Sequence, residues 1–190
     1  MIHDIIGRVR PDIPRPACRV RLVCGPPAAG KSTFVNEHAS LDDIVIDLDS
    51  IARELGFGRL RPKNATPQLL DERNRRLAAL TNEPRERVAW VILAAPSRSL
   101  RQWWCGVLGV TPPDLTVLIA PREELYRRIV ADPDRRMVRR YHMALVNKWL
   151  EQERTDNPGM FSSGADVNGF PTDPLHPWNR RNSHAATKAT

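Results

Sequence analysis

The sequence predicts an α/β protein in which a parallel β-sheet lies between two layers of helices. Short apolar runs rich in Val, Ile and Leu alternate with segments of helical periodicity between residues 19 and 154. These runs are almost continuously apolar, which is typical of parallel strands that are buried on both faces. The first run leads directly into a glycine-bounded loop that opens a helix. Together these observations indicate a three-layer α/β/α fold with a sheet of four or five strands.

The loop after the first expected strand, residues 19–24, carries the motif G-x-x-x-x-G-K-S. A preceding strand and a following helix, residues 31–39, provide the context in which this motif binds phosphate. The two glycines let the backbone approach phosphate closely, and the loop N–H groups converge with the helix N-terminus on phosphate oxygens. The residues expected to bind the nucleotide in this stretch are Gly25, Pro26, Pro27, Ala28, Ala29, Gly30, Lys31, Ser32 and Thr33.

Two side chains at the end of the loop suit a nucleoside triphosphate that is bound with Mg²⁺. Lys31 can reach the terminal phosphates, and the hydroxyl of Ser32 is the usual magnesium ligand in such loops. We therefore predict ATP and Mg²⁺ as cofactors. We expect no zinc, because His142 and His176 lack metal-ligating partners at a useful spacing.

The second expected strand, residues 44–49, ends in the acids Asp47 and Asp49. It follows the first helix after a short connection, so its end should lie at the same edge of the sheet as the phosphate loop. In an extended strand both acids point to one face. We assign Asp49 as the general base and anchor of a phosphate acceptor, and Asp47 as a ligand of a magnesium-bound water or its support. The alternative for either acid is a turn residue or a helix N-cap, and for Asp47 this alternative stays open.

The chain divides into a domain, in which helices and strands alternate, and two flanking segments. Residues 1–18, rich in proline, are expected to form an arm over the domain or a short added strand near residues 5–9. Residues 155–190 have no periodic apolar face and are expected to be a flexible, largely disordered tail. Between them, residues 19–154 form the predicted domain, with helices over residues 50–55, 66–81, 99–108, 123–131 and 135–154 and strands over residues 88–94 and 115–120.

Length and composition favour one domain. The 190 residues include 29 Lys and Arg against 22 Asp and Glu, for a net charge of +7, and the basic residues are mostly arginine. This charge permits a polyanionic partner, although a general bias toward arginine explains it as well. No apolar run is long enough to cross a bilayer, and the N-terminus lacks signal-peptide features. With three irregularly spaced cysteines, we expect a cytoplasmic protein with reduced thiols, monomeric and without a membrane partner.

The segment from Asp47 to Arg53 reads D-x-D-x-x-x-R and resembles an element of the polynucleotide kinase, zeta-toxin and gluconate kinase group of P-loop kinases. The order of phosphate loop, D-x-D, two apolar strands and the R-I-x-x-D-P-D-R run over residues 128–135 also resembles small phage-encoded proteins labelled AAA family ATPases. The likeness covers roughly residues 20–149. It implies a P-loop NTPase fold with the strand order 2-3-1-4.

The same resemblance implies a lid that carries arginines. The residues at the lid position are Arg135, Arg136, Arg139 and Arg140. We expect Arg128, together with Arg135 or Arg136, to contact phosphate, and we assign a catalytic role to Arg136. For any single one of them, the alternative is a solvated basic surface. Arg98 and Arg101, which follow the third apolar strand, are candidates for substrate binding or for the exposed start of a helix.

Two functions fit these features. The first is a kinase that transfers the γ-phosphate of ATP to a hydroxyl acceptor, such as a nucleic-acid 5′ end, a nucleotide or a small metabolite. It is favoured because the strand near residues 90–94 is followed by Ala95 and Pro96 rather than by an acid. The alternative is an ATP-dependent switch or accessory ATPase that acts with a phage or host protein complex. Basic residues between Arg53 and Arg76 favour a phosphate-bearing acceptor.

Overall fold

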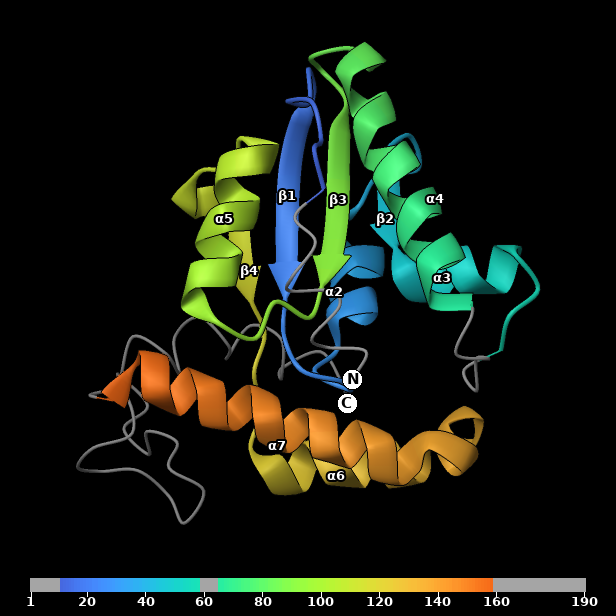
Figure 1. Cartoon of the computed structure of the whole chain (residues 1–190), viewed down its shortest axis with the longest axis vertical. Helices are drawn as coiled ribbons and strands as arrows, with labels where there is room; N and C mark the ends of the chain where they lie inside the picture. Colours follow the sequence, from blue (N-terminus) through green and yellow to red (C-terminus); the bar gives the residue numbers. More distant parts are fainter. Residues whose placement is uncertain (1–10, 59–64, 159–190) are drawn as a thin grey trace.

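The computed structural model describes residues 11–58 and 65–158. Its centre is a parallel sheet in the order β2-β3-β1-β4, which confirms the predicted arrangement (Figure 1). Continuous apolar runs fill the strands because both faces of the sheet are covered by helices. The strands are β1 (Arg19–Cys24), β2 (Ile44–Asp47), β3 (Val88–Leu93) and β4 (Leu115–Val117).

The register of the strands brings their carboxyl ends to one edge of the sheet. Cys24 of β1 pairs with Leu93 of β3 and with Val117 of β4, while Asp47 of β2 pairs with Ile92. The expected strand over residues 115–120 is too long, because β4 ends at Val117. Its neighbour β1 ends at Cys24, so only one further backbone bond, from Leu118 N to the Cys24 carbonyl at 2.8 Å, extends the pairing.

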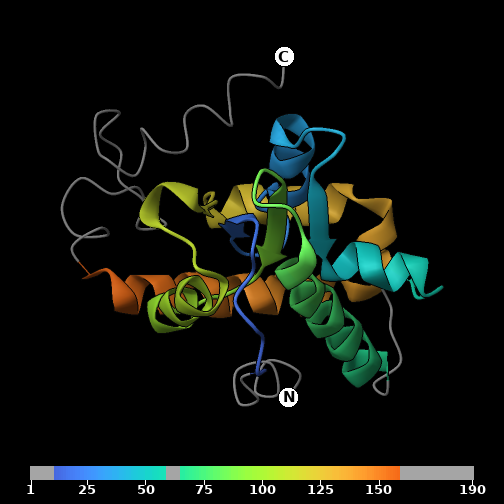
Figure 2. The ribbon, with the colours of Figure 1, turned by 90° about the horizontal axis from the view of Figure 1, so that it is seen from above.

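Six α-helices and three 3₁₀ turns surround the sheet within the described residues. Figure 2 shows α4 and α5 on the same side of the sheet, with α6 toward the opposite side. The helices are α2 (Lys31–His38), α3 (Leu48–Glu54), α4 (Ala65–Ala79), α5 (Arg98–Leu108), α6 (Arg122–Ala131) and α7 (Arg139–Asp156), and the turns are η1 (Leu80–Asn82), η2 (Pro112–Asp114) and η3 (Pro133–Val138).

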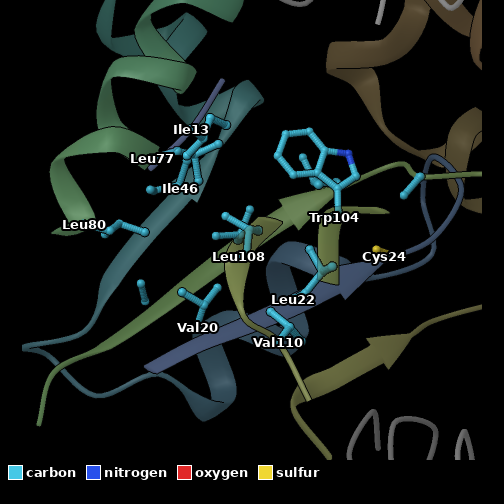
Figure 3. Close-up of a cluster of buried hydrophobic side chains, with 14 of the residues drawn as sticks. Ile13, Val20, Leu22, Cys24, Ile46, Leu77, Leu80, Trp104, Leu108 and Val110 are labelled. Atoms are coloured by element: carbon cyan, nitrogen blue, oxygen red, sulfur yellow. The ribbon is translucent and has the colours of Figure 1, made fainter. Parts of the chain in front are cut away.

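A separate apolar core packs on each face of the sheet. One core joins α4 and α5 to the sheet, and Figure 3 shows Ile13 beside Leu77 and Ile46 in this layer, with the Trp104 indole in the same cluster. The other core joins α2, α6 and α7 to the sheet and includes the fully buried Leu125. Burial of these side chains from water is the main driving force that holds the helices on the sheet.

The described part of the N-terminal arm lies against the first core. Ile13 and Cys18 are buried, and the N–H of Ala17 donates to the carbonyl of Leu80 at 3.0 Å. Figure 2 shows this segment passing between α4 and α5. The alternative strand near residues 5–9 lies outside the described residues, as does the expected tail from residue 159 onward.

The expected helix over residues 135–154 is wrong at its start. Residues 133–138 form the 3₁₀ turn η3, and the α-helix begins only at Arg139 and continues to Asp156. The carboxylate of Asp132 accepts a bond from Asp134 N at 3.0 Å and caps the turn. Val138 leaves helical geometry with φ −116 and ψ 9. Arg136 and Arg140 are therefore not one turn apart on a single α-helix.

Candidate functional site

The phosphate loop connects the end of β1 to the start of α2 (Figure 1). Gly25 passes so close to the loop after β4 that a Cβ there would lie 2.3 Å from the carbonyl oxygen of Leu118. Gly30 has a φ of 89° and immediately precedes the helix, so it turns the backbone in a conformation that side chains disfavour. Both positions of the motif therefore require glycine on steric grounds in this structure.

Lys31 lies over the loop that precedes it. Its Nζ donates to the carbonyl oxygens of Gly25, at 2.9 Å, and Pro26, at 2.8 Å. Burial lowers the pKa of Lys31 to about 8, although Asp47 and Asp49 partly offset this effect. Carbonyl oxygens carry only partial charge, so phosphate oxygens would stabilise the ammonium form better than these two contacts do.

Ser32 and Asp47 come together beside the loop, although they lie on different elements. The Ser32 hydroxyl donates to Asp47 Oδ2 at 3.4 Å, and only 8% of Asp47 is exposed. Burial, followed by the nearby charge of Asp49, raises the pKa of Asp47. A buried carboxylate with a raised pKa gains most when a cation binds next to it.

This pair of oxygen-bearing side chains fits Mg²⁺, which prefers oxygen ligands and keeps several waters. Ser32 would hold the ion directly, and Asp47 would hold one of its waters. The described residues contain no group of three or more His, Cys, Asp or Glu side chains that could hold a metal.

Asp49 does not lie in the strand. β2 ends at Asp47, and Asp49 sits in the first turn of α3. The expectation that the two acids share one face of an extended strand is therefore wrong. The reason is that the Asp47 carboxylate accepts from Asp49 N at 3.2 Å and caps the helix. The N-cap alternative for Asp47 thus holds together with its contact to Ser32.

The position of Asp49 still keeps it near the phosphate loop. Its side chain is exposed, and its charge raises the pKa of both Lys31 and Asp47. An acid that acts on both groups while facing solvent is placed where an acceptor molecule could reach it.

Arg128 of α6 lies over the phosphate loop. Its NH1 donates to the carbonyl of Ala28 at 3.2 Å, and its Nε binds Glu124 Oε1 at 2.7 Å. NH1 also lies 3.9 Å from the position that a Cβ on Gly30 would take. The structure thus brings Arg128 to the backbone groups that are expected to hold phosphate.

Arg135 and Arg136 of η3 differ in their surroundings. Arg135 is largely buried; its Nε binds Asp132 Oδ2 at 2.7 Å, and its NH1 lies 3.0 Å from His142 Nδ1. Its charge also contributes to the lowered pKa of Lys31. Arg136 is exposed, and no hydrogen bond or ion pair fixes its side chain within residues 11–58 and 65–158.

Arg101 is neither exposed nor available for substrate, which corrects both expectations for it. Its NH2 binds Glu153 Oε2 at 2.6 Å, and its NH1 donates to the carbonyls of Ala95 and Pro96. Both partners of the ion pair are buried. Arg98 is exposed at the start of α5, and its backbone N–H donates to Asp156.

These contacts hold α7 across the carboxyl ends of β1 and β3, as Figure 1 shows. Trp149 Nε1 donates to the carbonyl of Ala94 at 2.7 Å. Sequence reasoning missed this crossing, because the partners lie about 50 residues apart and no local pattern links them. A small, mostly apolar pocket of about 30 Å³ lies beside the crossing and is lined by Pro27, Ala94, Pro96, Leu145, Lys148 and Trp149.

A family described as an AAA domain, AAA_33, matches residues 20–152 of the chain. The chain belongs to this family. The match spans the phosphate loop, both acids of the D-x-D segment and η3, and it supports membership of the P-loop kinase and ATPase superfamily, whose members bind nucleoside triphosphate with Mg²⁺. Curated proteins give no significant match. Among the described residues, no helix has the length and apolar character that crossing a membrane requires.

Proposed function

We propose that this AAA_33 protein is a kinase that transfers the γ-phosphate of ATP to a hydroxyl acceptor. The observation that carries the proposal is the meeting of Ser32 with Asp47 beside the phosphate loop, at 3.4 Å, with the exposed Asp49 in the next turn. A magnesium position and a solvent-facing carboxylate within reach of the phosphates are the two requirements of direct transfer to a hydroxyl.

Each residue has a distinct task in this reaction. Lys31, Arg128 and the N–H groups of the loop orient the triphosphate. Mg²⁺, which Ser32 and Asp47 would hold, would neutralise charge on the phosphate oxygens. Asp49 accepts the hydroxyl proton as the acceptor oxygen bonds to the γ-phosphorus. The bond from that phosphorus to the bridging oxygen breaks, and ADP leaves with the bonding electrons. Arg135 or Arg136 offsets the charge that spreads over the transferred phosphoryl group.

The residues that follow β3 favour a kinase over a motor-type ATPase. Such ATPases place an acid at this strand end, and here the strand is followed by Ala94 and Ala95. The Ala94 carbonyl is bound by Trp149, and Ala95 has a φ of 35°, so the backbone at this end is held in an unusual conformation.

The ion pairs on α4 reduce the positive charge that is available to bind a phosphate-bearing acceptor. Arg75 and Arg76 both bind Glu72, and Arg76 also binds Glu54 at 2.6 Å. These arginines therefore offer less free positive charge than the sequence suggests. Arg59, Arg61 and Lys63, which would add charge beside them, lie outside the described residues. A nucleic-acid 5′ end and a small phosphorylated acceptor both remain within the proposal.

Incubation with γ-labelled ATP and a panel of 5′-hydroxyl oligonucleotides, nucleosides, nucleotides and sugars tests the proposal. We expect label on one acceptor class, with little release of free phosphate. Brisk hydrolysis with no labelled acceptor would contradict the kinase and favour the ATP-dependent switch or accessory ATPase that works with a protein complex.

Salt dependence then separates the acceptor classes. Neutralised phosphates of an oligonucleotide release counterions, so its affinity should fall about tenfold or more between about 50 and 200 mM salt. A small acceptor with one phosphate would show a much shallower slope. Oligonucleotide binding that is insensitive to salt would contradict the nucleic-acid reading.

A further inference from the structure

Two arginines of the described residues are buried, and they differ in whether a carboxylate lies next to them. Arg101 and Arg73 are each 5% exposed. Arg101 has the carboxylate of Glu153 at 2.6 Å and two backbone carbonyls. Arg73 has no carboxylate at ion-pair distance among residues 11–58 and 65–158. Since buried charges in proteins are normally paired, Arg73 is the exception that requires an explanation.

The neighbours of Arg73 are neutral. Its Nε and NH2 both donate to Asn74 Oδ1, at 3.2 and 2.8 Å, and its guanidinium lies over the Trp104 ring, 5.2 Å from the ring centroid. Burial lowers its pKa to about 10, and no acid of the described part of the chain opposes this effect. An amide oxygen and an aromatic face stabilise a cation, but neither one neutralises it.

Arg73 also stands at a position where an apolar residue is expected. Leu69, Arg73 and Leu77 lie at successive turns of the buried stripe of α4. The next arginines along the helix, the exposed Arg75 and the half-buried Arg76, have carboxylate partners. Within residues 11–58 and 65–158, the helix therefore pairs these two arginines and leaves the buried Arg73 without an anion.

The geometry of the guanidinium leaves one edge open. Asn74 occupies the edge formed by Nε and NH2, so NH1 and the second N–H of NH2 can accept a bidentate oxyanion. Among the described residues, the side-chain nitrogens that are both fully buried and without a hydrogen-bond partner are Arg122 Nε and Arg139 Nε, so NH1 of Arg73 is not completely enclosed. A ligand oxygen would approach the guanidinium at this atom.

We propose that Arg73 is the binding residue of a second anion site, between α4 and α5, that takes a phosphate or carboxylate group of a small ligand. Asn74 orients the guanidinium, and Trp104 forms the apolar floor beneath it. The described arm, with Ile13 buried in the same core, covers this region (Figure 2). The site is separate from the phosphate loop and does not depend on the phosphotransfer proposed above.

Inorganic phosphate is the first probe, with acetate as the carboxylate probe. The full chain is first saturated with Mg²⁺–ADP, so that the phosphate loop is occupied. The ¹⁵N–Hε resonance of Arg73, assigned by its loss in Arg73→Lys, should shift saturably with phosphate, while that of Arg75 should not. A response to phosphate alone defines a phosphate site, and an equal response to acetate defines a general oxyanion site. No shift of Arg73 with either probe overturns the proposal.

Thermal unfolding supplies an independent readout. Phosphate should raise the midpoint temperature of unfolding above its value in chloride of equal ionic strength. Arg73→Leu should abolish this difference without lowering the midpoint temperature in chloride. Arg75→Leu, an exposed control on the same helix, should keep the difference. Asn74→Asp should supply the missing anion, raise the midpoint and weaken the phosphate response at least about tenfold. A phosphate effect that survives in Arg73→Leu, or a large loss of stability in chloride, overturns the proposal.

Discussion

Nucleotide binding should make the protein take up a proton at mildly alkaline pH. The pKa of Lys31 is lowered to about 8, chiefly by burial, while its ammonium group faces only carbonyl oxygens. Phosphate oxygens at the same place favour the charged form, so the pKa should return toward its ordinary value of about 10.4 on binding. A group whose pKa rises on binding takes up protons between its two pKa values.

The magnitude follows from the two pKa values. Binding should take up about 0.1 proton at pH 7, about half a proton at pH 8 and about 0.9 proton at pH 9. The apparent affinity for ATP should accordingly fall about tenfold from pH 7 to pH 9. Phosphate groups are fully ionised above about pH 7, so the ligand contributes little to this change.

Isothermal titration calorimetry in two buffers of different ionisation enthalpy measures the uptake directly. Lys31→Arg is the control, because arginine stays charged throughout this range and should show no uptake. Asp47→Asn should move the uptake to lower pH, since Asp47 holds the pKa of Lys31 up. Uptake near zero at pH 9, with an unchanged affinity, would refute the account of Lys31.

Further predictions concern the loop and the helix that crosses it. Gly25→Ala should abolish nucleotide binding or destabilise the fold, because its Cβ would lie 2.3 Å from a backbone oxygen; normal ATP binding and an unchanged melting temperature would contradict this. Glu153→Ala should lower the free energy of unfolding by about 3–5 kcal/mol, since it leaves Arg101 buried and unpaired. Chemical denaturation measures it, with the exposed Glu151→Ala on the same helix as control; equal effects of the two changes would show that the ion pair contributes nothing special.

Local sequence patterns predicted much of the fold. The phosphate loop and the helices that cover the sheet follow from periodicity and from one motif with strong steric demands at Gly25 and Gly30. The strand order follows from the resemblance to P-loop kinases. The placement of Ser32 next to Asp47 also follows, because the strand after the first helix must end at the same edge of the sheet.

Some features could not be predicted because a residue can adopt either of two local structures, or because the residues in contact lie far apart in the sequence. Asp47 can continue a strand or cap a helix. In the structure it caps α3, which places Asp49 in the first turn of that helix. The pairing of Arg101 with Glu153 joins α5 to α7, and both residues look like exposed charges in isolation. Likewise, the basic residues between Arg53 and Arg76 suggest a surface for a phosphate-bearing acceptor, whereas Arg73 among them is buried with Leu69 and Leu77 on α4.

The role of Asp49 as the base that receives the acceptor proton is the central claim, and one paired measurement tests it. ATP affinity and single-turnover transfer of the γ-phosphate are compared for the parent, Lys31→Ala, Asp49→Asn and Asp42→Asn, the last being an exposed acid just before β2. Asp49→Asn should slow transfer about 10²–10⁴-fold and leave ATP binding nearly unchanged. Lys31→Ala should lose both ATP binding and transfer, and Asp42→Asn should keep both. Transfer at the parent rate in Asp49→Asn would contradict the account.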